Sequence, residues 1–189
     1  MEDIINQVGS TDYGMPDLVS FTIGGNSLGF AEMVLACIYP WIGLNHSSCD
    51  QAITNGLSAA KSLRPRYDEL FDKIRSYSPD ATIVASTYVS FWNETQPNDC
   101  YFGKFSTAAQ KGQMNEIAQT TRDALYASSH ARRDPNVIFV DMNHAWDGER
   151  LCEGETTWFQ TALSRSAMHP NLDGEKSYLS EFKNRLGCR

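Results

Sequence analysis

Short apolar runs alternate with longer amphipathic segments along the chain. Three of the runs are rich in β-branched residues and bounded by turn residues, which is typical of buried strands: residues 18–23, 81–86 and 137–140. In the longer segments apolar residues recur every three or four positions, which predicts helices over residues 30–38, 53–77, about 107–129 and 172–186. Pro65 predicts a kink or break inside the second of these helices.

The order of these elements predicts the fold class. Strands that alternate with helices favour an α/β protein whose parallel sheet is covered on both faces. Ligands bind such sheets at the carboxyl ends of the strands, so the segments 24–28, 87–105 and 141–170 matter most for function. No repeat, low-complexity tract or linker divides the 189 residues, and we expect a single domain over residues 1–189.

The composition narrows the range of partners. Sixteen Lys and Arg against twenty-three Asp and Glu give a net charge of −7, which argues against nucleic acid. The longest apolar run, residues 33–38, is far shorter than the roughly 20 residues of a membrane helix, so no membrane span is expected. Residues 1–7 contain neither the basic nor the apolar region of a secretory signal.

The cysteines and two glycosylation motifs favour a secreted protein. Five cysteines occur at no CxxC spacing, which favours disulfides over a zinc ribbon or a redox pair, and we expect neither a metal nor a cofactor. Asn45 and Asn93 each begin an N-x-[S/T] triplet in a segment that resembles a loop, as glycan acceptors do. The odd number of cysteines is explained if the partner of Cys188 lies outside this chain.

Two short motifs carry the candidate chemistry. After the first strand, Gly24 and Gly25 allow a sharp turn, and Asn26 can direct its amide into the cleft as an oxyanion donor. The alternative is a plain strand-to-helix turn with Asn26 as the helix cap. Near the other end, His169 lies on a loop before the last helix, where a general base would be mobile enough to act; the alternative is a capping or surface histidine.

Taken together, these motifs resemble the SGNH (GDSL-type) hydrolases, and the secreted esterase branch in particular. The resemblance rests on Thr-Ile-Gly-Gly-Asn at residues 22–26, the following Gly29-Phe30 and Cys37, and the His169-Pro170-Asn171 segment that opens the last helix. It implies a three-layer α/β/α sandwich with a flavodoxin-like parallel sheet, and hydrolysis of carboxylic esters through a serine acyl-enzyme. Asn26 would then donate to the oxyanion, and His169 would activate the serine and protonate the leaving alcohol.

The chain departs from the family pattern at several positions. Ser27 stands where the family usually has Asp, and Ser166 stands where an Asp often orients the histidine, so the main-chain carbonyl of Ser166 is the expected substitute in a Ser-His dyad. Asp141 and His144 have the same three-residue offset, but no Pro-Asn follows His144 and no terminal helix begins there. We therefore expect His169 rather than His144 to be the base.

The largest departure is the absence of the Gly-Asp-Ser motif that carries the family's nucleophile. Only 23 residues precede Gly24, whereas a strand, a crossover helix and a second strand need about 30 or more. Ser10 follows no apolar strand and is a poor candidate. We expect an N-terminally truncated family member whose sheet has an exposed edge. The alternatives are a catalytically silent module that binds glycans or lipids and, ranked last, a flavodoxin-like domain that binds a nucleotide.

The secreted interpretation leads to further expectations about disulfides and substrate. Cys37 with Cys49, and Cys100 with Cys152, are the expected bridges, although spacing does not determine connectivity. Aromatic residues of the long loops are candidates for lining an acyl pocket: Tyr88, Phe91, Trp92, Tyr101, Phe102, Trp146, Trp158 and Phe159. We expect an extracellular monomer that acts on a small ester of lipid or acylated-carbohydrate type.

Overall fold

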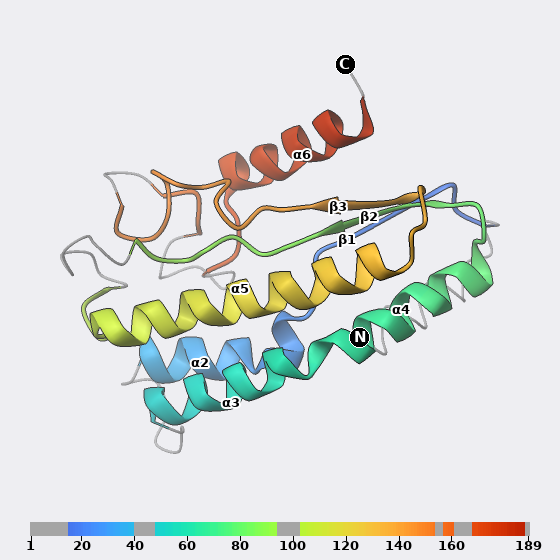
Figure 1. The fold of residues 1–189 in the computed structure, drawn as a ribbon. Helices are drawn as coiled ribbons and strands as arrows, with labels where there is room; N and C mark the ends of the chain where they lie inside the picture. Colours follow the sequence, from blue (N-terminus) through green and yellow to red (C-terminus); the bar gives the residue numbers. More distant parts are fainter. Residues whose placement is uncertain (1–14, 40–47, 94–102, 154–156, 161–167, 188–189) are drawn as a thin grey trace.

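A parallel sheet lies between two layers of helices (Figure 1). The computed structural model describes residues 15–39, 48–93, 103–153, 157–160 and 168–187. Within them the strands β1 (Leu18–Phe21), β2 (Thr82–Ser86) and β3 (Val137–Val140) pair in the order β1-β2-β3, all parallel. The predicted α/β class with a parallel sheet is confirmed.

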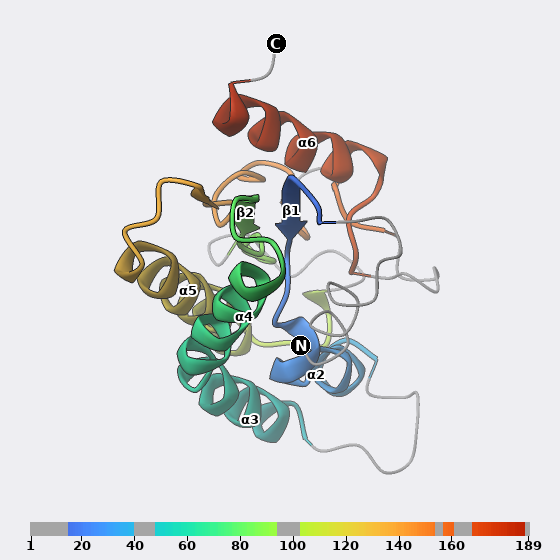
Figure 2. The ribbon, with the colours of Figure 1, turned by 90° about the vertical axis from the view of Figure 1, so that its right-hand side faces the viewer.

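Five described α-helices form the two outer layers. Beneath the sheet in Figure 1 lie α2 (Phe30–Cys37), α3 (Cys49–Lys61), α4 (Leu63–Tyr77) and α5 (Ala108–Ala131), and α5 packs against both α3 and α4. Helix α6 (Leu172–Leu186) lies on the opposite face, as the side view in Figure 2 also shows. Helices α5 and α6 both contact β3.

The helix predicted over residues 53–77 is two helices, and this prediction was wrong at its start and at its break. Helix α3 begins earlier because the Ser48 hydroxyl caps it, accepting from the Gln51 backbone N–H at 3.2 Å. The break falls at Ser62, whose N–H and hydroxyl both bond the Ala59 carbonyl, and not at Pro65. Pro65 occupies the first turn of α4, where its missing N–H interrupts no helical hydrogen bond.

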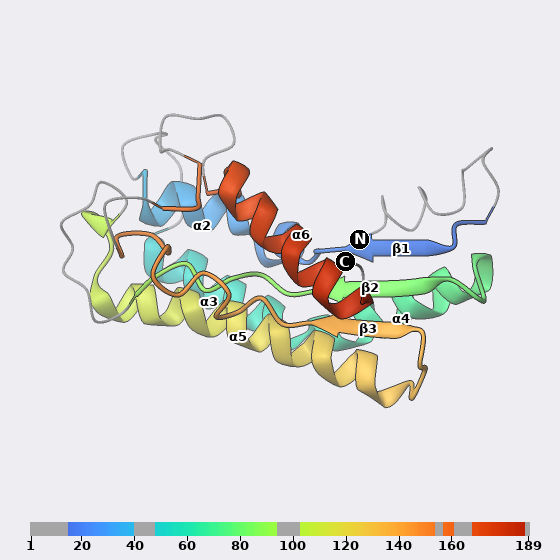
Figure 3. The ribbon, with the colours of Figure 1, turned by 90° about the horizontal axis from the view of Figure 1, so that it is seen from above.

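Strand β1 is an edge strand within the described sheet. It pairs with β2 on one side and with no described strand on the other (Figure 3). Leu18 is 49% exposed, whereas residues 83–86 of β2 are fully buried. Hydrogen-bonding groups on one side of β1 therefore have no partner strand among the described residues.

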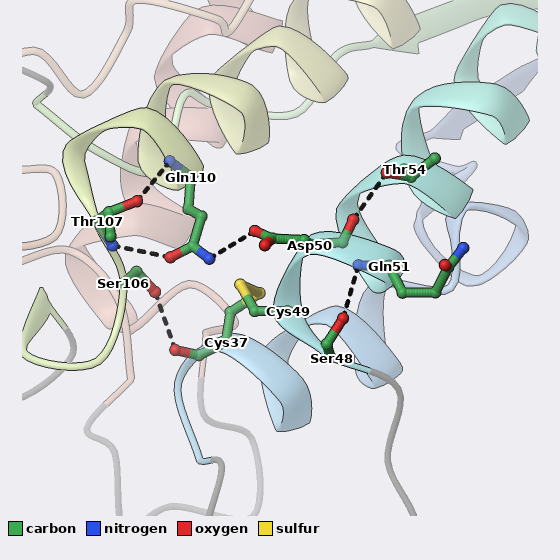
Figure 4. Close-up of a disulfide and its surroundings, with 9 residues drawn as sticks. All are labelled: Cys37, Ser48, Cys49, Asp50, Gln51, Thr54, Ser106, Thr107 and Gln110. Atoms are coloured by element: carbon green, nitrogen blue, oxygen red, sulfur yellow. Dashed lines mark hydrogen bonds between the residues drawn. A yellow bond between two sulfur atoms is a disulfide. The ribbon is translucent and has the colours of Figure 1, made fainter.

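A disulfide joins the end of α2 to the start of α3. Cys37 and Cys49 are bonded, as predicted, with their Cα atoms 4.7 Å apart (Figure 4). Cys152 is also disulfide-bonded, but Cys100, its predicted partner, lies outside the described residues. No helix in the described part of the chain has the length and apolar character needed to cross a membrane.

Candidate active site

The turn after β1 holds Asn26 at the carboxyl edge of the sheet. Gly24 adopts φ 124°, a backbone conformation that side chains disfavour, and the chain then enters a single 3-10 turn, η1 (Gly25–Leu28). A Cβ built on Gly24 would lie only 2.7 Å from the Tyr67 hydroxyl oxygen. Asn26 does not cap a helix, because the N-cap residues of η1 and α2 are Gly24 and Gly29. The prediction that Asn26 caps the helix, which was part of the alternative, is therefore wrong.

Hydroxyl groups from β2, from the segment that follows it and from α4 hold this turn in place. The Tyr88 hydroxyl accepts from the Gly25 N–H at 3.0 Å, and the Tyr67 hydroxyl donates to the Ile23 carbonyl at 2.9 Å. The Ser86 hydroxyl bonds both the Thr22 hydroxyl and the Phe21 carbonyl. Burial raises the pKa of Tyr67 and of Tyr88, so both remain neutral hydroxyls at physiological pH.

The loop before α6 is fixed through its backbone while its histidine side chain is exposed. Gln160 donates its backbone N–H to the His169 carbonyl at 2.7 Å and its side-chain amide to the Pro170 carbonyl at 3.1 Å. The Asn171 side chain accepts from two N–H groups of α6 and donates to the Thr157 carbonyl at 2.7 Å. Met168, with φ 67°, is buried. The hydrogen bonds anchor the backbone at His169 and at the two residues that follow it.

Asn26 and His169 line one cavity, of about 410 Å³. Both residues are exposed, and neither side chain has a hydrogen-bond partner among the described residues. The polar part of the lining also includes Thr22, Ser27 and Tyr88. The rest is apolar and comes mainly from α2, α5 and the long loops: Phe30, Val34, Ile38, Val89, Phe91, Met114, Ala118, Trp146, Phe159 and Met168. The arrangement brings an amide donor and an imidazole to the polar end of an apolar cavity.

The other residues singled out from the sequence lie elsewhere. His144 does not line the cavity; it contacts Asp147 at 3.4 Å, and the Asp141 carboxylate is bound by Arg122 at 2.8 Å. Ser10 and Ser166 lie outside the described residues, as do Tyr101 and Phe102. Of the remaining aromatic candidates, Trp92 and Trp158 do not line the cavity, whereas Tyr88, Phe91, Trp146 and Phe159 do. The described residues include no group of three or more His, Cys, Asp or Glu able to hold a metal ion.

The sequence pattern does not predict that the hydroxyls of Tyr67 and Ser86 hold the turn before Asn26. Tyr67 fits the helical repeat of apolar residues, and the repeat gives no sign that its hydroxyl reaches the Ile23 carbonyl. Ser86 was assigned only to a buried strand. A signal did exist for Tyr88, because it lies two residues after β2, at the sheet edge where a site was expected.

Comparison with known proteins identifies the class to which this fold and site belong. The sequence model of the GDSL-like lipase/acylhydrolase family matches residues 2–176, and the chain belongs to this family. The resemblance to the SGNH (GDSL-type) hydrolases is thereby confirmed.

Individual relatives come from Streptomyces. A lipase of Streptomyces rimosus is 29% identical over 166 residues, which cover 86% of this chain and 58% of that protein. The chain therefore matches little more than half the length of this curated relative. Two solved structures share the fold with a TM-score of 0.80, each covering 97% of this chain and 75% of the other: the extracellular lipase of Streptomyces rimosus, at 24% identity, and phospholipase A1 of Streptomyces albidoflavus NA297, at 22%.

Proposed function

We propose that this chain supplies the oxyanion donor and the general base of a carboxylic ester hydrolase that uses a Ser-His acyl-enzyme mechanism. The nucleophilic serine is not among the residues of this chain that we assign to the site. The observation that carries the proposal is that Asn26 and His169, far apart in the sequence, line one cavity with both side chains exposed and unpaired among the described residues. Membership of the GDSL-like family supports ester hydrolysis as the reaction class.

The proposed chemistry assigns one task to each side chain. A serine hydroxyl attacks the ester carbonyl while the His169 imidazole accepts its proton, and the Asn26 amide donates to the oxygen that becomes negative. His169 then gives the proton to the leaving alcohol, and water hydrolyses the acyl-enzyme by the same steps. The main-chain carbonyl of Ser166 is proposed to orient the imidazole.

Hydrolysis of p-nitrophenyl acetate tests this assignment. We expect the 189-residue chain to act no faster than its His169→Ala variant, whereas a version extended upstream through a Gly-Asp-Ser segment turns over readily. In the extended protein, His169→Ala is expected to lower kcat by about 10²–10⁴-fold and Asn26→Ala by about 10²–10³-fold. An extended protein whose rate does not depend on His169 would contradict the proposal.

A catalytically silent binding module remains the second candidate, because the cavity is formed without a serine nucleophile assigned to it. Covalent labelling of the extended protein by a fluorophosphonate probe excludes this candidate, and ligand binding without turnover supports it. We further propose that the whole protein is secreted, glycosylated at Asn45 and Asn93, and monomeric. The disulfide between Cys37 and Cys49 and the extracellular relative support secretion.

A further inference from the structure

The cavity extends well beyond the two polar side chains, along one face of α2. Phe30, Val34 and Ile38 follow one another at four-residue intervals and all line it. Met114 and Ala118, one turn apart on α5, line it as well. No Asp, Glu, Lys or Arg is among the described residues that form its wall. An uncharged hydrocarbon segment therefore fits this part of the cavity better than a sugar or a charged group.

The end of α2 that is further from Asn26 in the sequence is firmly held. Ile38 lines the cavity there and is fully buried, directly after the disulfide-bonded Cys37. The Ser106 hydroxyl donates to the Cys37 carbonyl at 2.9 Å, which fastens the end of α2 to the segment leading into α5 (Figure 4). Ile38 is therefore the part of this wall that we expect to stop a longer ligand.

Aromatic rings line the cavity beside α2. The Phe30 and Phe91 rings stack with centroids 5.4 Å apart, and Phe91 contacts Phe159 at 5.7 Å. Each of these three residues lines the cavity. A row of rings in mutual contact resists displacement, so this stretch of the wall is held in place. We call the part of the cavity between α2 and these rings the slot.

We propose that this slot binds a single extended acyl chain and that the length of α2 limits it to about ten carbons. The proposal rests on the proposed function, which places the ester carbonyl between Asn26 and His169. From Phe30 to Ile38 the helix rises eight steps of about 1.5 Å, or about 12 Å. A staggered alkyl chain built from bonds of about 1.5 Å advances about 1.25 Å per carbon, so about ten carbons reach Ile38.

Val34 is the position at which a substitution shortens the slot most directly. It lies midway between Phe30 and Ile38, about 6 Å along the helix from either, and is half-buried. A large side chain at this position blocks the slot at about the fifth carbon. Leu35, the next residue, is also half-buried but does not line the cavity, and it offers a matched control on the same helix.

Fatty-acid binding to the 189-residue chain tests the proposal without requiring a nucleophile. The probes are sodium salts of saturated fatty acids of four to fourteen carbons, measured by isothermal titration calorimetry below their critical micelle concentrations. We expect the affinity to rise about fourfold per added methylene, up to about ten carbons, and then to level off. For Val34→Trp we expect the plateau to begin at about five carbons, whereas Leu35→Trp keeps it at about ten.

Several results would overturn the proposal. They are no binding at ten carbons, an affinity that rises without a plateau to fourteen carbons, and equal profiles for Val34→Trp and Leu35→Trp when both variants are folded by circular dichroism. Failure here is distinct from failure of the proposed function, because an extended protein that hydrolyses p-nitrophenyl acetate through His169 needs no deep slot.

Discussion

Replacing Gly24 by alanine tests how the turn that carries Asn26 is held. Its backbone has φ 124°, and a Cβ there would lie 2.7 Å from the Tyr67 hydroxyl oxygen. An alanine held at such a φ costs about 1–3 kcal/mol. Tyr67 is 0% exposed and cannot swing into solvent, so displacing its hydroxyl from the Ile23 carbonyl costs about 1–3 kcal/mol more. We expect Gly24→Ala to lower the free energy of unfolding by about 2–6 kcal/mol.

Urea denaturation followed by tryptophan fluorescence measures this loss, and Gly148 provides the control. Gly148 also has a positive φ, of 98°, but a Cβ there meets no atom within 4 Å. Gly148→Ala therefore reports backbone strain alone, about 1–3 kcal/mol. The stability that Gly24→Ala loses beyond the loss in Gly148→Ala measures the cost of the collision with Tyr67.

A double-mutant cycle decides whether the Tyr67 hydroxyl is the colliding group. Tyr67→Phe removes only that oxygen, so combining it with Gly24→Ala relieves the collision. We expect the two substitutions to be non-additive by at least about 1 kcal/mol, in the direction of partial rescue. Purely additive losses, or equal losses in Gly24→Ala and Gly148→Ala, would refute this account of the turn.

Three further predictions concern the support of the site and its surroundings. Replacing both Cys37 and Cys49 by serine opens a crosslink of sequence separation 12 and is expected to lower the free energy of unfolding by about 3 kcal/mol in urea. Asn171→Ala removes the cap of α6 and is expected to cost about 1–2 kcal/mol in the same assay, whereas Leu172→Ala, at a 70% exposed neighbour, costs under about 0.5 kcal/mol. Hydrogen bonds, chiefly the one from the Arg150 side chain, lower the pKa of Glu153 from 4.5 to about 2. The ionised Glu153 therefore stabilises the folded state above pH 4.5, and this contribution is lost as the pH falls toward 2. Glu153→Gln should therefore reduce the stability difference between pH 6 and pH 3 by about 2 kcal/mol, and an unchanged difference would contradict this origin of the shift.

Much of the fold could be predicted because its elements are defined by local patterns. The bounds of β3 (Val137–Val140) and α6 (Leu172–Leu186) match the predicted ranges, since turn residues and a cap flank them in the sequence. The start of α3 could also have been predicted, because Ser48 and Gln51 have the spacing of a capping box. The break at Ser62 could not be predicted, because it depends on a turn closed by hydrogen bonds to the Ala59 carbonyl.

The sequence predicts that Asn26 and His169 lie at one cavity, but it does not predict the contacts that hold them there. Asn26 and His169 follow from motifs at strand and helix ends, where parallel sheets place their ligands. The predicted first strand ends two residues early, at Phe21, because the Thr22 hydroxyl bonds Ser86 and the Ile23 carbonyl bonds Tyr67. These partners lie more than 40 positions away, and no local pattern specifies such tertiary contacts.

The hydrogen bonds among the described residues around the site hold the backbone beside Asn26 and His169 and do not involve the two side chains themselves. Backbone groups beside Asn26 and His169 are bonded to Tyr88, Tyr67 and Gln160, so the two segments that carry these side chains are held in place. The amide and the imidazole themselves take no part in that support and are exposed at the mouth of an apolar cavity. Asn171 and Thr107, by contrast, use their side chains to cap helices. Folding therefore accounts for how the backbone at residues 26 and 169 is held, and the proposed ester hydrolysis gives their side chains a task.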